Sequence, residues 1–304
     1  MRVCVVGAGA IGSLYAAHLA QVADVTVLTR RKEHARALEE QGLRVSGRSD
    51  HVARLQATSD PAQLDDADLC IVATKATHLE QAAAALEGRL PGASVMTIQN
   101  GLGAEEVVRR YGDWPLISAV TFMSGNRHGD THVEYILDTE TWLGPYETTP
   151  AETVEQVASL LVRSGLKAKA FGDLRPAQWS KLIFNATVNS VSALTELPHD
   201  RHFADREGPA GLGHLVHGLV EEGKRVAEAA GIPLHDDPWE MNVLATRRGS
   251  AHVPSMLEDV QAGRPTEIDL ITGALVREAA RTGVEVPLHT ALYGLVKAKE
   301  AGCG

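Results

Sequence analysis

A polar stripe in an otherwise apolar segment is the clearest sign of chemistry in this sequence. Lys181, Asn185 and Asn189 are spaced four residues apart, and at about 100° per residue they fall within a narrow arc of one helix face. Burying an unpartnered lysine is costly, so we expect this helix to line a cleft, where the ammonium can stabilise negative charge and the amides can bind a polar ligand. A structural hydrogen-bond network is the alternative.

Two later segments offer partners for that stripe. Ser255 lies near the first turn of one predicted helix. Thr266 and Asp269 have the spacing of a capping box, which predicts a second helix with Glu267 in its first turn. Acidic residues favour helix N-termini for structural reasons, but the same dipole would keep Glu267 ionised, as the counter-ion of a lysine must be.

The N-terminal segment has the pattern of a strand, a glycine-rich turn, a helix and a second strand. Val3, Val5 and Val6 form a β-branched run, helix 10–21 follows, and strand 25–28 comes next. The turn between them reads Gly7, Ala8, Gly9, Ala10, Ile11 and Gly12, the G-x-G-x-x-G spacing. The first glycine allows a tight turn, the second lets backbone approach a pyrophosphate, and the third permits close helix packing. This context predicts a dinucleotide site, and a glycine turn without a ligand is the alternative.

The residues after the second strand indicate which dinucleotide is preferred. NAD sites place Asp or Glu there for the ribose 2′-hydroxyl, whereas this chain has Thr29, Arg30 and Arg31. A guanidinium can bind a 2′-phosphate through bidentate, charge-assisted hydrogen bonds. We therefore predict NADP(H), with Arg30 as the first candidate; a solvated basic turn is the alternative.

Regular alternation of strands and helices continues as far as residue 98 and predicts a parallel sheet with helices on both faces. Lys75 follows one buried strand, and Gln99 and Asn100 follow another, so these side chains are expected at the carboxyl edge where ligands bind. The predicted elements are helices 32–41, 77–86 and 151–163, strands 43–46, 51–57, 69–73, 93–98 and 167–171, and antiparallel strands within 115–146.

From residue 176 onward the periodicity is helical. The sequence thus predicts an α/β N-terminal Rossmann-type dinucleotide-binding domain over residues 1–172, followed by an all-α C-terminal substrate domain over residues 173–304.

Composition excludes several classes of protein. The 304 residues carry a formal charge of −10, which disfavours a nucleic-acid or anionic-membrane surface. Cysteines at 4, 70 and 303 form no disulfide pattern, and the chain enters the nucleotide motif too early for a cleavable signal, so we expect a cytoplasmic protein.

The histidine pairs 199/202 and 214/217 lack a third ligand at a suitable interval, and no metal is predicted. A homodimer is compatible with the sequence, which does not decide the oligomeric state.

Several segments together resemble ketopantoate reductase (2-dehydropantoate 2-reductase) nearly end to end. They are GAGAIG at 7–12, TKAT at 74–77, QNG at 99–101, KLIFNATVN at 181–189, SMLEDVQAGRPTEID at 255–269 and VKAKE at 296–300. The K-L-x-x-N-x-x-x-N and S-M-L-x-D…T-E-I-D segments are far more specific than the glycine motif.

The resemblance implies NADPH-dependent reduction of 2-dehydropantoate, a small 2-keto acid, to (R)-pantoate in the pantothenate route to coenzyme A. It makes Lys181 the general acid and Glu267 its catalytic partner. By the same motif match, the substrate is held by Asn100, Asn185, Asn189 and Ser255, with Asp259 as a further contributor. Lys75 would sit at the junction of cofactor and substrate, where Asn100 and Glu267 would also contact the cofactor.

Elementary chemistry supports these implied roles. Hydride delivery to a ketone creates negative charge on oxygen, which an ammonium can stabilise and protonate. Residues 120–140 lack the small-residue and H-x-G-x-G character usual in the family, and Thr272 stands where Asn is frequent. A reductase of the same mechanism acting on another 2-keto acid is therefore the first alternative. A non-catalytic NADP(H)-sensing protein is the second.

Overall fold

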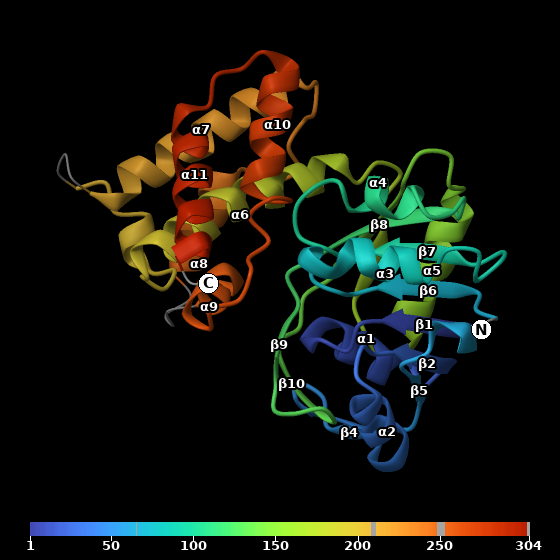
Figure 1. The fold of residues 1–304 in the computed structure, drawn as a ribbon. Coiled ribbons are helices and arrows are strands. Elements are labelled where there is room, and N and C mark those ends of the chain that lie inside the picture. Colours follow the sequence, from blue (N-terminus) through green and yellow to red (C-terminus); the bar gives the residue numbers. More distant parts are fainter. Residues whose placement is uncertain (65, 208–210, 248–252, 303–304) are drawn as a thin grey trace. The chain divides into compact units, whose positions relative to one another are not determined.

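The computed structural model describes residues 1–304 except 65, 208–210, 248–252 and 303–304, so Cys303 lies outside the described part. Its internal contacts divide the chain into two compact units (Figure 1). The sheet unit comprises Met1–Gln99 and Ala104–Leu174, and the helical unit comprises Asn100–Gly103 and Arg175–Gly304. The assignment of one function to each domain stays a prediction.

The sheet unit is built on one eight-stranded sheet, in the order β12-β11-β8-β7-β6-β1-β2-β5. Every neighbouring pair is parallel except β8 and β11. The strands are β1 (Arg2–Val6), β2 (Asp24–Leu28), β5 (Gln56–Thr58), β6 (Leu69–Val72), β7 (Ser94–Thr97), β8 (Leu116–Thr121), β11 (Thr141–Pro145) and β12 (Ala168–Ala170). The predicted parallel, Rossmann-type sheet is confirmed, and its continuous apolar runs are buried because both faces are covered.

A second, four-stranded sheet was not predicted. It consists of β4 (His51–Ala53), β3 (Leu43–Gly47), β10 (His132–Leu137) and β9 (Ser124–Arg127), in that order. The prediction of a single strand over 51–57 was wrong, because β4 joins this sheet while β5 joins the large one. The expected antiparallel strands within 115–146 are likewise shared between both sheets, and β10 pairs parallel with β3.

Helix α1 (Ala10–Leu19) contacts both sheets of this unit, which explains why most of its side chains are buried. The remaining helices of the unit are α2 (Lys32–Gln41), η1 (Pro61–Gln63), η2 (Ala76–His78), α3 (Leu79–Ala85), α4 (Ala104–Arg109) and α5 (Ala151–Arg163). The helix predicted over 77–86 is thus a short 3₁₀ turn followed by α3.

In the helical unit, α6 (Arg175–Thr195) contacts five other helices and forms the centre of the packing, as predicted for an all-α domain (Figure 1). Its neighbours are α7 (Leu212–Ala229), α8 (Pro238–Thr246), α9 (Ser255–Gln261), α10 (Thr272–Thr282) and α11 (Pro287–Gly302); η3 (Arg201–Phe203) completes the unit. The long helix predicted from the polar stripe is therefore present and mostly buried.

The capping box predicted at Thr266 does not form, because α10 begins only at Thr272 and Glu267 lies in the turn before it. The backbone N–H of Thr266 donates to Glu300 Oε1 at 2.7 Å instead of to Asp269. Asp269 accepts hydrogen bonds from the Tyr293 hydroxyl and the Lys297 ammonium. Long-range partners on α11 therefore replace the local cap, and the helix-dipole explanation for Glu267 was wrong.

Within the described residues, no helix is both long and apolar enough to span a membrane. Cys4 and Cys70 are both buried and are register partners on the adjacent strands β1 and β6. They occupy core positions that are ordinary for small buried thiols.

A buried histidine makes stability depend on pH. His18 on α1 is 4% exposed, with Nδ1 3.1 Å from the Ser164 carbonyl and Nε2 3.1 Å from the Ser49 hydroxyl. Burial lowers its pKa, whereas the unfolded chain titrates near the ordinary value of about 6.5. The neutral ring therefore stabilises the fold fully above that value, and stability is lost as the pH falls below it.

We expect the urea-measured free energy of unfolding to decrease from pH 7.5 to pH 5.5, and to decrease less steeply in His18→Gln than in the wild type. The exposed His128→Gln serves as the control and should retain the wild-type pH dependence. Identical slopes for His18→Gln and the wild type would refute the role of His18. His34 and His289, whose pKa values burial also lowers, would then have to carry the effect.

Candidate functional site

The glycine turn after β1 is closely packed at its first and third glycines. Gly7 has a φ of +100°, which favours glycine. A Cβ on Gly12 would lie 2.0 Å from the Gly7 carbonyl oxygen and 3.1 Å from Ala73 Cβ. No larger residue fits there without moving α1 away from β1 and β6.

Gly9, by contrast, borders open space: a Cβ built on it meets no atom within 4 Å. It is the N-cap of α1, with no side-chain cap and no acidic residue in the first turn, so the first N–H groups of the helix remain available to an anion. Beside this turn, the buried Thr74 Oγ1 has no hydrogen-bond partner among the described residues. An open cradle, a helix N-terminus and an orphaned hydroxyl together fit the phosphates of a dinucleotide.

The two arginines after β2 have different surroundings. Arg31 is the N-cap residue of α2 and forms an ion pair with Asp130, which Arg127 also contacts. Arg30 is exposed, and its Nη1 donates to His78 Nε2 at 3.0 Å. Arg31 thus has a structural role, and Arg30 is the arginine better suited to bind a ligand.

Two predicted side chains that follow β6 and β7, Lys75 and Gln99, differ in exposure and in hydrogen bonding. Lys75 is exposed and is the N-cap of η2. Gln99 Nε2 donates to the carbonyls of Val72 and Thr74, at 2.9 Å each, and so ties the two strand ends together. Gln99 is therefore structural, while Lys75 has the position expected of a ligand contact.

In the helical unit, three predicted residues share one set of interactions. Asn100 Nδ2 donates to Glu267 Oε2 at 3.3 Å, and the Glu267 carboxylate acts electrostatically on the half-buried Lys181. Desolvation lowers the pKa of Lys181 to about 8, and Glu267 opposes this shift. An ammonium with a pKa this close to neutrality is well matched to donate a proton.

The segment that carries Asn100 is held rigidly. Leu102 N donates to the Leu270 carbonyl at 2.9 Å, and a Cβ on Gly101 would lie only 1.8 Å from that same oxygen. The QNG sequence therefore requires glycine at its third position so that Asn100 can reach Glu267.

The rest of the polar stripe lies as the periodicity predicts. Asn185 and Asn189 are 8% and 6% exposed and lie one and two helical turns after Lys181 on α6. Ser255 is the exposed first residue of α9. Asp259, one turn later and buried, accepts from Arg264 Nε at 3.0 Å. Both amides and the serine hydroxyl can thus serve a ligand, whereas Asp259 fixes the loop that follows α9.

The histidine pairs considered as metal ligands have other surroundings. His199 Nε2 lies 2.8 Å from Asn242 Oδ1, and the ring packs edge-on against Phe203. His217 packs against Trp239. No group of three or more metal-binding side chains occurs among the described residues.

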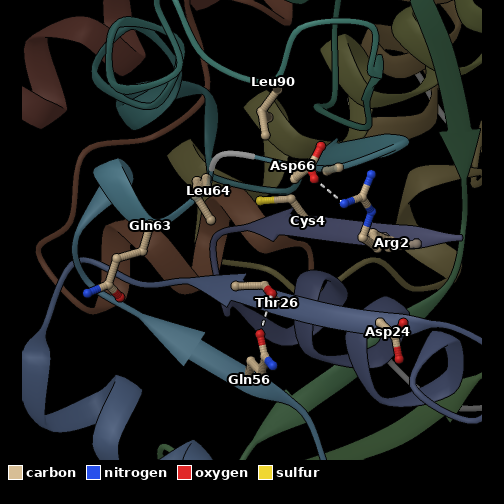
Figure 2. A pocket seen from close by; sticks show the side chains of 11 residues that line it. Arg2, Cys4, Asp24, Thr26, Gln56, Gln63, Leu64, Asp66 and Leu90 are labelled. Atoms are coloured by element: carbon tan, nitrogen blue, oxygen red, sulfur yellow. Dashed lines mark hydrogen bonds and ion pairs between the residues drawn. The ribbon is translucent and has the colours of Figure 1, made fainter.

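A cavity of about 320 Å³ lies elsewhere in the sheet unit (Figure 2). It is lined by Arg2 and Asp24 at the starts of β1 and β2, by Thr26 and Gln56 farther along the sheet, and by Asp66, which forms an ion pair with Arg2. In open α/β sheets ligands bind at the opposite, carboxyl ends of the strands. This cavity is therefore not the candidate site.

Comparison with known proteins identifies the family. The family model described as Ketopantoate reductase PanE/ApbA matches residues 3–148, and its C-terminal counterpart matches residues 173–300. The chain belongs to the ketopantoate reductase family. The resemblance drawn from the motifs is thus confirmed, and the family is one of oxidoreductases.

Individual ketopantoate reductases match over their whole length. The chain is 31% identical to the 2-dehydropantoate 2-reductase of Halobacterium salinarum and 28% identical to that of Pyrococcus abyssi. Each alignment covers 98% of the length of the relative. These matches cover 98% and 99% of this chain. The crystal structure of a PanE/ApbA family ketopantoate reductase from Ralstonia eutropha superposes with a TM-score of 0.90 at 29% identity, covering 100% of this chain and 99% of that one.

Proposed function

We propose that this chain is an NADPH-dependent 2-dehydropantoate 2-reductase that forms (R)-pantoate, a precursor in pantothenate and coenzyme A synthesis. The observation that carries the proposal is the set Lys181, Glu267 and Asn100 in the helical unit: a desolvated ammonium, its counter-ion and an amide that bonds to that counter-ion. The names of the full-length relatives support the same activity.

NADPH is the proposed cofactor. The glycine turn would hold its pyrophosphate at the N-terminus of α1. This turn consists of Gly7, Ala8, Gly9, Ala10, Ile11 and Gly12. Arg30 would bind the 2′-phosphate, and Lys75 would lie near the reacting end. When bound, the cofactor supplies a hydride from its nicotinamide ring.

In the reaction, the protein binds the keto acid, stabilises the negative charge that develops on its carbonyl oxygen and protonates that oxygen. Asn185, Asn189 and Ser255 would bind the carboxylate and hydroxyl groups of the substrate without adding formal charge. As the carbonyl oxygen becomes negative, the Lys181 ammonium stabilises it and donates a proton from Nζ. Glu267, oriented by Asn100, keeps Lys181 protonated at neutral pH.

The pH profile of turnover tests this arrangement. Because Lys181 must be protonated, kcat for reduction should be level below its pKa of about 8 and fall about tenfold per pH unit above it. In Glu267→Gln the loss of the carboxylate should lower the pKa of Lys181 and move the falling limb to lower pH. Glu258→Gln, an exposed acid on α9, is the control and should leave the profile unchanged. An unshifted limb in Glu267→Gln would contradict the proposed coupling.

A related 2-keto acid remains the second candidate substrate, because the chain departs from the family pattern at two places. Residues 124–137 include β9 and β10 of the second sheet, and Thr272 is fully buried, with Oγ1 2.7 Å from Ser190 Oγ. Thr272 thus links α10 to α6, which accounts for a small hydroxyl at this position. A panel of 2-keto acids distinguishes the two candidates.

A further inference from the structure

His78 stands beside the proposed 2′-phosphate site and has no role in the function described above. It ends η2, which follows β6, and its Nε2 is 3.0 Å from Nη1 of Arg30, which follows β2. A guanidinium only donates hydrogen bonds, so Nε2 must accept and the imidazole is neutral, with its proton on Nδ1. Since β2 and β6 flank β1 on either side, this pair lies at the carboxyl edge that also carries the glycine turn.

The charges that act on His78 are both positive. Burial is the largest cause of its lowered pKa, and the Arg30 guanidinium and the Lys75 ammonium lower it further. Glu80, on the helix that follows, accepts hydrogen bonds from Arg110 at 2.9 Å and from Tyr111 at 2.6 Å. Burial and the two cations thus both favour the neutral ring, and an incoming dianion would oppose their effect on its pKa.

We propose that His78 is a ligand of the 2′-phosphate of NADP(H) and takes up a proton at Nε2 when this phosphate binds. Arg30 then directs its N–H groups to the phosphate oxygens, and the protonated Nε2, which previously accepted from Arg30, becomes a donor to the same group. The proton comes from solvent. The inference rests on the proposed function only for its choice of cofactor.

A phosphate is a better fit than a carboxylate because it offers two charges and three acceptor oxygens to two cationic partners. It also distinguishes the two nicotinamide cofactors, since NAD lacks this group. His78 would therefore add to the selectivity for NADP(H) most strongly at lower pH, where its protonation costs least.

The direction of the pH effect follows from linkage. The dianion raises the pKa of His78 in the complex above its value in the free protein, so binding takes up protons and tightens as the pH falls. Each unit by which the pKa rises strengthens binding by up to about tenfold at the acidic limit. Above about pH 6 the phosphate itself stays largely dianionic and does not mask the effect.

The test is calorimetric binding of NADP⁺ and NAD⁺ between pH 6.5 and 8.0, in buffers of different ionisation enthalpy so that proton uptake is counted directly. The wild type is compared with His78→Gln, which cannot be protonated, and His78→Arg, which keeps a permanent positive charge. His128→Gln, an exposed histidine paired with Glu134, is the matched control. A thermal melt checks that each variant is folded.

We expect the wild type to take up a fraction of one proton with NADP⁺ and none with NAD⁺, and its Kd for NADP⁺ to fall roughly tenfold from pH 8.0 to 6.5. His78→Gln should lose both effects, and His78→Arg should bind NADP⁺ tightly at every pH without proton uptake. Equal uptake in wild type and His78→Gln would overturn the inference and leave the proposed function intact. Failure of the wild type to bind NADP⁺, with NAD⁺ bound normally, would overturn both the inference and the choice of cofactor.

Discussion

Lys181→Met is expected to lower kcat for ketopantoate reduction by about 10²- to 10⁴-fold, the usual contribution of a positioned general acid. Methionine has a similar length and suits the apolar surroundings of α6, so the fold should be retained. The Kd for NADPH, measured by fluorescence titration, should change by less than about threefold, because the glycine turn and Arg30 are untouched.

The control is Lys224→Met on α7, a lysine whose ion pairs with Asp237 and Glu221 are partly exposed and contribute little. It should retain nearly wild-type kcat and NADPH binding. A Lys181→Met enzyme that turns over within about tenfold of the wild type would exclude Lys181 as the proton donor.

Gly9→Val should weaken cofactor binding strongly without unfolding the protein. The backbone at Gly9 is extended and suits any residue, and a Cβ there meets only open space, so the melting temperature should stay within a few degrees of the wild type. The valine side chain would occupy the place proposed for the pyrophosphate. We expect the Kd for NADPH to rise by roughly 100-fold or more, equivalent to the loss of about 2.7 kcal/mol of binding free energy.

Gly172→Val is the matched control, because a Cβ on Gly172 also meets no atom within 4 Å. It should bind NADPH as the wild type does. Normal NADPH binding by Gly9→Val would mean that the space above the turn is not the pyrophosphate site.

Local pattern was sufficient for much of the fold. The strand β6 is a continuous apolar run, β1 and β7 are mostly apolar and buried, and α2 and α5 begin and end at the predicted residues. In these elements the local propensity for helix or strand favours the same structure as the pattern of buried apolar residues, so the nearby sequence decides the structure. The stripe of Lys181, Asn185 and Asn189 was equally predictable, since helical periodicity alone aligns the three.

The errors arise where distant residues compete with local preferences. Thr266 looked like a helix cap, but Glu300 on α11 binds both its N–H and its hydroxyl, and α10 starts six residues later. The second sheet joins β3 to β10, which are separated by more than 80 residues, and no local pattern predicts such a pairing.

The candidate site was recognisable in its residue types but not in its interactions. Neither the bond from Asn100 to Glu267 nor the contact between Arg30 and His78 has a sequence signal, because each joins segments that only folding brings together. The available hint for His78 was its place three residues after Lys75, beside a strand end. The different surroundings of Arg30 and Arg31 likewise became visible only with Asp130 in place.

The central claim, NADPH-dependent reduction of ketopantoate, is tested most directly by following NADPH oxidation with ketopantoate beside pyruvate, 2-ketoisovalerate and 2-ketoisocaproate. We predict a kcat/KM for ketopantoate of about 10⁴ M⁻¹s⁻¹ or higher, well above the values for the other three acids. Uniformly slow turnover of all four, with tight NADPH binding, would contradict the proposed substrate. Faster turnover of one of the other acids would assign the same machinery to a different 2-keto acid.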